Sequence, residues 1–184
     1  MIKEVIPLTD EEWAFFIQFG KTIKLKPNDT FFTSGVVADK VGFLKEGILR
    51  AYHTKDCGKV ITCYFYHLPK NNIVSLHTSF TQDKPSEHTV EAITNCEILY
   101  LEKSDLHSCL ERYPAFERLV RIFAENEYLK SSKRINDLQT ESAKEIYRTF
   151  LRESGDLLLK VPQHMIASYL GMSQYTLSKI KKEI

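Results

Sequence analysis

The C-terminal segment from Gln163 onward contains polar side chains whose types and spacing suit hydrogen bonding to duplex DNA. Gln174, Tyr175, Ser178 and Lys179 fall on the first turns of a short predicted helix, and we expect them to contact base edges in the major groove. Lysine can donate to guanine but lacks the planar fork of arginine, so we expect weaker discrimination at Lys179. Contacts to phosphates, which fix register without reading sequence, are expected from Gln163, Ser173, Thr176 and Lys182.

The small and apolar residues of this segment predict the helix-turn-helix that must position those side chains. Counting from Gln163, Ala167 is at position five, where a small residue lets two helices cross, and Gly171 is at position nine, the turn. Ser173 can cap the second helix, expected over Ser173–Lys182. The faces that pack together are provided by Ile166, Leu170, Leu177 and Ile180. The alternative is an ordinary helical hairpin within a protein core.

The composition is that of a soluble globular protein, with 43% hydrophobic and 27% charged residues among 184 and a net charge of +1. No apolar run is long enough to span a membrane, and the acidic start Met1–Glu12 does not read as a signal peptide. The cysteines are widely spaced, which favours reduced thiols in a cytoplasmic protein over a disulfide or iron–sulfur framework. They are Cys57, Cys63, Cys96 and Cys109.

The N-terminal half predicts one short helix followed by many short strands. Thr9 and Glu12 form a potential capping box for a helix over Leu8–Phe19. Between Ile23 and Leu101, short alternating runs are separated by turn residues, a pattern typical of an antiparallel sandwich or roll. With the helices that follow, the fold class is α+β.

The longest predicted helix covers Pro114–Leu138, after a shorter helix that Ser104 can cap. Its heptad seam predicts pairing with the same helix of a second chain, with Asn126 setting the register, and packing within one chain is the alternative. The seam residues are Leu119, Ile122, Asn126, Leu129 and Lys133. A further amphipathic helix, Thr140–Glu153, leads into the helix-turn-helix.

This order of elements resembles the Crp/Fnr-type transcription regulators, most closely the short forms of Bacteroidetes-type bacteria. The resemblance rests on the runs Phe43-Leu-Lys-Glu-Gly-Ile-Leu-Arg-Ala-Tyr and Thr89-Val-Glu-Ala-Ile-Thr-Asn-Cys-Glu-Ile-Leu, and on the C-terminal segment. It implies a cyclic-nucleotide-binding-like β-roll over 1–113, a dimerisation helix over 114–138 and a helix-turn-helix domain over 139–184 without a full wing. It also implies a homodimer that binds a two-fold symmetric DNA operator, with RNA polymerase and a small-molecule effector as further partners.

The expected effector pocket departs from the pattern of cyclic-nucleotide-binding relatives. Their Gly-Glu and Arg-Ser/Thr pairs, which hold ribose and phosphate, fall here on Ser75-Leu76 and Ser86-Glu87. A phosphate needs a cation, whereas Ser86 has no charge and Glu87 repels, so we expect no response to cyclic AMP or GMP. The pocket residues either serve another ligand or form a vestigial pocket; they are Ser75, Leu76, His77, Ser86, Glu87 and His88.

Histidines raise the alternative of a metal-dependent cupin-like enzyme, since that fold is also a small β-roll. Such enzymes need a His-x-His pair with a carboxylate and a third histidine, and no His-x-His occurs in the sequence. There is also no Gly-rich phosphate loop or nucleophile motif. We therefore expect no metal, no cofactor and no catalysis. The other alternative is an interaction protein whose helix-turn-helix contacts a protein partner.

Overall fold

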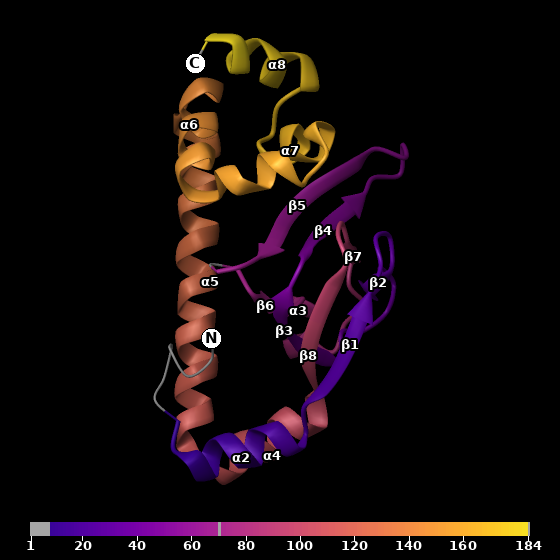
Figure 1. Cartoon of the computed structure of the whole chain (residues 1–184), viewed down its shortest axis with the longest axis vertical. Coiled ribbons are helices and arrows are strands. Elements are labelled where there is room, and N and C mark those ends of the chain that lie inside the picture. The colour runs from indigo at the N-terminus through magenta and orange to yellow at the C-terminus, as the bar shows by residue number, and fades with distance from the viewer. Residues whose placement is uncertain (1–7, 70, 184) are drawn as a thin grey trace.

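The computed structural model describes residues 8–69 and 71–183, and they form a β-roll flanked by helices (Figure 1). The strands are β1 (Lys21–Leu25), β2 (Thr30–Phe32), β3 (Lys40–Glu46), β4 (Ile48–Thr54), β5 (Val60–His67), β6 (Ile73–Val74), β7 (His88–Ala92) and β8 (Cys96–Glu102). They make two four-stranded antiparallel sheets, with orders β1-β8-β3-β6 and β2-β7-β4-β5. Apolar side chains from both sheets meet between them, including the fully buried Leu44, Leu49 and Ile98. The predicted antiparallel roll and the α+β class are confirmed.

Most of the helices lie along one side and at both ends of the roll, whereas the short α3 lies among the strands (Figure 1). They are α2 (Asp10–Gln18), α3 (His77–Gln82), α4 (Lys103–Arg112), α5 (Pro114–Thr140), α6 (Ala143–Ser154), the 3-10 turn η1 (Gly155–Leu159), α7 (Gln163–Tyr169) and α8 (Gln174–Glu183). In Figure 1, α5 runs beside the roll for most of the length of the molecule, with α2 and α4 at one end and α6, α7 and α8 at the other. The long helix therefore connects the two ends of the molecule.

The N-terminal helix begins as predicted, with Thr9 as its N-cap. Glu12 N donates to Thr9 Oγ1 at 3.2 Å, and Thr9 N donates to Glu12 Oε2 at 2.7 Å. The buried Phe16 packs between Phe43 of β3 and Phe116 of α5, with ring centroids 5.6 and 5.7 Å away. This aromatic cluster fixes the start of the long helix against the roll.

Two predicted helix starts were wrong. α4 follows β8 directly, so its N-cap is Glu102 rather than Ser104, and no side chain caps it. Instead, Lys103 N donates to Asp39 O at 2.7 Å, which satisfies a donor of the first turn. α6 begins at Ala143 rather than Thr140, because α5 continues to Thr140 and Ser142 caps α6 through Glu145 N at 3.3 Å.

The C-terminal helices pack directly on the roll through β5. Phe65 is buried among the apolar residues of α6 and α7, and its ring lies 5.1 Å from that of Tyr169. Thr62 N donates to Ser168 Oγ at 3.0 Å. From α5, the Arg134 guanidinium lies 4.1 Å from the Tyr169 ring centroid and donates to the Tyr169 carbonyl. One strand and one helix thus hold α7 in place.

Candidate nucleic-acid interface and adjoining cavity

Helices α7 and α8 form the predicted helix-turn-helix. Gly171 takes a positive φ of 71° in the turn, and Met172 N donates to the carbonyl of the buried Ala167 at 3.0 Å. Ser173 Oγ accepts a hydrogen bond from Thr176 N at 2.9 Å, which caps α8. The small residue, the turn glycine and the cap therefore act as the sequence indicated.

The packing of α8 decides which of its residues remain accessible. All four predicted packing residues, Ile166, Leu170, Leu177 and Ile180, are buried in one cluster with apolar residues of α6. The opposite face exposes Gln174, Tyr175, Lys179 and Lys182, and the Tyr175 side chain is 81% exposed. α8 therefore presents a polar and basic face to solvent at the end of the molecule (Figure 1).

The remaining candidates for DNA contact already bond to one another within the motif. Gln163 Nε2 donates to Ser178 Oγ at 2.9 Å, and both side chains are half-buried. The hydroxyls of Ser173 and Thr176 share a hydrogen bond of 2.8 Å. The first bond connects α7 to α8, and the second lies at the start of α8. The predicted DNA-contacting residues therefore divide into a group that is bonded within the motif and a group that is exposed.

Most of the charged residues of α8 are basic. Its basic residues, Lys179, Lys181 and Lys182, are all exposed. Its one acidic residue, Glu183, lies 3.7 Å from the Lys144 ammonium of α6. The acid is thus partly compensated by a neighbouring helix, and the net charge near the C-terminal end of α8 is positive, as suits a polyanion.

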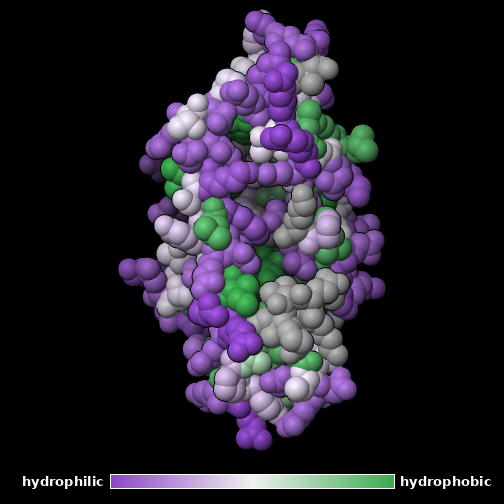
Figure 2. Space-filling view, turned by 90° about the vertical axis from the view of Figure 1, so that its left-hand side faces the viewer, coloured by the Kyte–Doolittle hydropathy of each residue, from purple (hydrophilic) through white to green (hydrophobic). Residues whose placement is uncertain are grey.

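The predicted seam of α5 does not lie on a single exposed face. Leu119 is buried against the aromatic cluster of its own chain, and Ile122 packs partly on the same cluster. Asn126 and Leu129 are exposed, whereas Lys133 Nζ donates to Glu153 Oε1 of α6 at 2.6 Å. Exposed apolar side chains of α5 occur further along the helix: Tyr128, Leu129 and Ile135 are 71%, 63% and 58% exposed. Figure 2 shows this side of the molecule, where hydrophobic patches interrupt a largely hydrophilic surface.

A cavity of about 890 Å³ lies between the roll and α5. It is lined by all six predicted pocket residues: Ser75, Leu76, His77, Ser86, Glu87 and His88. The sequence reasoning missed the other lining residues, among them Tyr64 and Tyr66 of β5 and, on α5, Phe123, Ala124, Glu127, Tyr128 and Ser131. The α5 residues of the wall follow one another at spacings of one or three residues, which places them on one face of the helix beside the predicted seam. This spacing is the sequence signal that could have identified them.

Two tyrosines connect the cavity wall to neighbouring elements. Tyr66 Oη donates to Ser75 O at 2.9 Å, and Tyr64 Oη lies 3.3 Å from Glu127 Oε1. Lys130 Nζ donates to the same Glu127 oxygen at 2.9 Å. Burial, and secondly the charge of Glu127, raise the pKa of both tyrosines well above the ordinary value, so both remain protonated donors.

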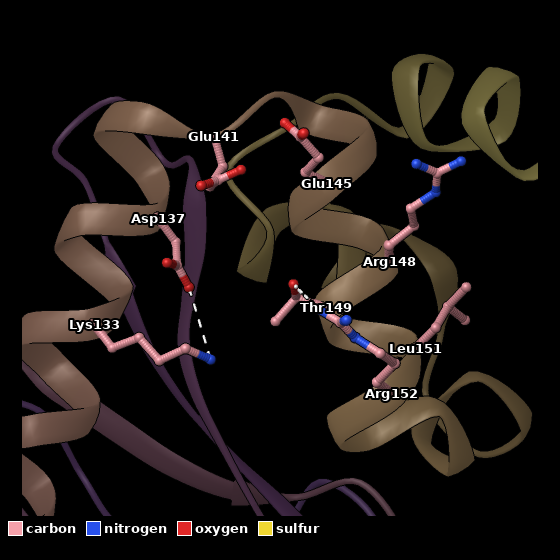
Figure 3. A pocket seen from close by; sticks show the side chains of 8 residues that line it. All are labelled: Lys133, Asp137, Glu141, Glu145, Arg148, Thr149, Leu151 and Arg152. Atoms are coloured by element: carbon pink, nitrogen blue, oxygen red, sulfur yellow. Dashed lines mark hydrogen bonds and ion pairs between the residues drawn. The ribbon is translucent and has the colours of Figure 1, made fainter.

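A second, open cleft of about 590 Å³ separates α5 from α6 (Figure 3). Its lining is mostly charged and of mixed sign: Lys133, Asp137, Glu141, Glu145, Arg148 and Arg152, with Thr149 and Leu151. In Figure 3, Lys133 reaches toward Asp137, and their charged groups are 3.9 Å apart. The repulsion of Glu145 raises the pKa of Glu141. The three basic and three acidic side chains balance in formal charge, so the cleft has no excess charge of one sign for a ligand.

The part of the chain that the structure describes offers no arrangement for metal or disulfide chemistry. Residues 8–69 and 71–183 contain no group of three His, Cys, Asp or Glu side chains placed to hold a metal ion. The four cysteines are free thiols. None of the described helices is long and apolar enough to cross a membrane.

Comparisons with known proteins agree with this architecture. Residues 22–113 match the cyclic nucleotide-binding domain family, whereas no curated protein sequence gives a significant match. FixK2 of Bradyrhizobium japonicum superimposes with a TM-score of 0.78 at 18% identity, covering 89% of this chain and 83% of its own. The c-di-GMP-responsive global regulator CLP of Xanthomonas campestris gives 0.74 at 13% identity, covering 95% and 91%.

A Crp/Fnr-family regulator of Eubacterium rectale gives a TM-score of 0.72 at 16% identity, covering 96% of this chain and 83% of its own. The superpositions extend over 89–96% of this chain, which includes residues of the roll, the long helix and the C-terminal helices. At such identities the likeness concerns the fold, and the family rests on the sequence match over the roll. The chain belongs to the cyclic nucleotide-binding domain family, with the fold of the Crp/Fnr regulators.

Proposed function

We propose that this chain is a sequence-specific DNA-binding transcription regulator that acts as a homodimer and does not respond to cyclic AMP or GMP. The observation that carries the proposal is the surface of α8. Its apolar side is buried, and its other side exposes Gln174, Tyr175, Lys179 and Lys182. Amide, phenol and ammonium groups on one helix suit base edges and phosphates in a major groove.

The proposal assigns separate tasks to three parts of the chain. Residues 1–113 form the sensor, 114–138 pair with a second copy, and 139–184 bind duplex DNA. The exposed apolar residues of α5, Tyr128, Leu129 and Ile135, support pairing along the later turns of that helix. RNA polymerase and a small-molecule effector are the further partners, and the function is regulation rather than catalysis.

The proposal makes different predictions for the residues of α8. Gln174→Ala removes a base contact, so the binding free energy for the preferred duplex should weaken by about 1–3 kcal/mol. The loss should be smaller for duplexes in which the contacted base pair is changed. Lys182→Ala removes a phosphate contact, so affinity should fall for all duplexes alike. The slope of log K against log salt concentration should decrease in magnitude by about 1. Lys55→Ala, an exposed lysine of the β4–β5 turn, is the matched control and should change neither.

The test begins with selection from a random duplex pool by the purified protein without added ligand. Enrichment of a palindrome with half-sites about 34 Å apart supports a DNA-reading dimer. Binding of all duplexes alike, with the salt sensitivity of phosphate contacts alone, contradicts sequence-specific reading in the effector-free state. Identical behaviour of Gln174→Ala and Lys182→Ala contradicts the division between base and phosphate contacts.

A further inference from the structure

The cavity between the roll and α5 has the size of a small-molecule site. Its volume of about 890 Å³ lies within the range that ligand pockets usually occupy. Apolar or aromatic side chains form much of its wall, from Ala51 of β4, Tyr64 and Tyr66 of β5, and Phe123 and Ala124 of α5. A ligand in this position would contact both the sheet and the long helix.

Several hydroxyl groups of the wall form hydrogen bonds within the protein itself. Ser79 Oγ donates to Lys84 O at 2.6 Å and accepts from Ala38 N at 2.9 Å. Ser86 Oγ accepts from His88 N at 3.0 Å. The Tyr66 hydroxyl is held by the Ser75 carbonyl. These three hydroxyl groups are therefore already bonded within the protein.

The charges of the wall disfavour an anion. Among the described lining residues there is no arginine, and the one lysine, Lys84, is exposed at the rim together with Glu87. Deeper in the wall, Glu127 is compensated by Lys130 at 2.9 Å. Burial, with a contribution from His53, lowers the pKa of His88, which favours the neutral imidazole. A phosphate placed here would lose its hydration without gaining a cation.

We propose that this cavity binds an uncharged, mainly apolar small molecule, of the size of a ring system or a medium-length acyl chain. The inference deepens the proposed function, since it rests on the roll acting as the sensor of a DNA-binding regulator. The occupant would be recognised by shape and by burial of apolar area, because several wall hydroxyls are already bonded within the protein and Lys130 compensates the charge of Glu127.

The position of the cavity gives its occupant a route to the DNA-binding helices. Tyr64 and Tyr66 line the cavity, while Phe65 between them packs on Tyr169 of α7, and Thr62 bonds to α7 as well. Adjacent residues of a strand point to opposite faces, so β5 has the cavity on one side and α7 on the other. A ligand that displaces the tyrosines would therefore shift the support of α7.

The experiment measures binding of N-phenyl-1-naphthylamine, an uncharged fluorescent apolar probe, to the full chain. We expect saturable binding, one probe per chain, that excess cyclic AMP does not displace. Ala124→Trp fills the cavity from α5 and should weaken probe binding about tenfold or more, and Ala124→Leu by a smaller factor. Gln82→Trp adds the same indole to the exposed end of α3, outside the cavity lining, and should bind the probe as the unmodified chain does.

Several results would overturn the inference. They are the absence of saturable binding to the unmodified chain, displacement of the probe by cyclic AMP, and equal affinity in Ala124→Leu, Ala124→Trp and the unmodified chain. Circular dichroism checks that each variant is folded, and Ala124→Leu keeps the test decisive should the larger side chain disrupt folding. Duplex selection on the same protein, run with and without the probe, separates the two proposals. A selected operator without probe binding refutes only the ligand class, and probe binding without DNA selection in either condition refutes only the regulator.

Discussion

The turn between α7 and α8 depends on a backbone conformation that only glycine adopts at little cost. Gly171 has a φ of 71°, and a Cβ atom added there would lie 3.2 Å from Leu138 Cδ2 of α5. Left-handed backbone costs an L-residue about 1–2 kcal/mol. Leu138 is 46% exposed, so it can move aside and adds little to this cost. We therefore expect Gly171→Ala to lower the free energy of unfolding by about 1–2 kcal/mol, which for a chain of this length corresponds to a fall in Tm of roughly 2–8 °C.

A second glycine provides a matched control for the backbone contribution. Gly58, in the β4–β5 turn, has a φ of 79°, and an added Cβ would meet no atom within 4 Å. Gly58→Ala should therefore show the backbone cost alone, and the difference between the two variants measures the contact with Leu138. Double substitution of Gly171→Ala with Leu138→Ala should abolish that contact.

The two variants should differ more in DNA binding than in stability. Gly171 sets the angle between α7 and α8, so Gly171→Ala should also weaken binding to a selected duplex, whereas Gly58→Ala should leave it unchanged. Thermal denaturation followed by circular dichroism gives Tm, and duplex titration gives affinity. If Gly171→Ala retained the full Tm and affinity of the unmodified chain, the role assigned to this turn would be wrong.

Three further changes test helix capping, the cavity wall and dimerisation. Ser142→Ala removes the capping box of α6 and should cost about 1 kcal/mol by denaturation, whereas Ser104→Ala removes no cap and should be nearly neutral. The pKa of His88 is lowered from its ordinary value of 6.5, so between the lowered and the ordinary pKa the unfolded chain binds more protons than the folded chain. Tm should therefore fall as the pH decreases from about 6.5 through the lowered pKa, and His88→Gln should reduce this fall. Leu129→Asp places a charge on the exposed apolar face of α5 and should weaken dimers about tenfold or more in sedimentation.

Each of these three predictions has a control substitution or a result that would contradict it. His107→Gln alters an exposed histidine on α4 and should leave the pH dependence of Tm unchanged; an equal effect of both histidine variants contradicts the assignment to His88. Arg118→Asp, an exposed position on an earlier turn of α5, should disturb dimers less than Leu129→Asp. Equal costs of Ser104→Ala and Ser142→Ala would show that capping does not distinguish the two helices.

Local sequence patterns were sufficient for the roll and the C-terminal helices. The capping pair Thr9 and Glu12 and the turn residue Gly171 appear in the structure as predicted, because hydrogen bonds to adjacent backbone and the steric limits on φ act over a few residues. The predicted start of α4 was wrong because a long-range contact decides it. Ser104 has the right type for a cap, but Lys103 N bonds to Asp39, which is remote in the sequence.

The sequence by itself therefore determined the antiparallel roll, the long helix and the helix-turn-helix in their order, and it placed Gln174, Tyr175, Lys179 and Lys182 on the solvent side of α8, but it missed the short helix α3 within the roll. Only the tertiary structure decided that Leu119 is buried in its own chain, and that Gln163 and Ser178 bond to each other. It also decided that Tyr64 joins Ser75 in one cavity. The physical reason is that periodicity defines which face of a helix or strand is apolar, whereas the neighbour of that face depends on how distant segments pack.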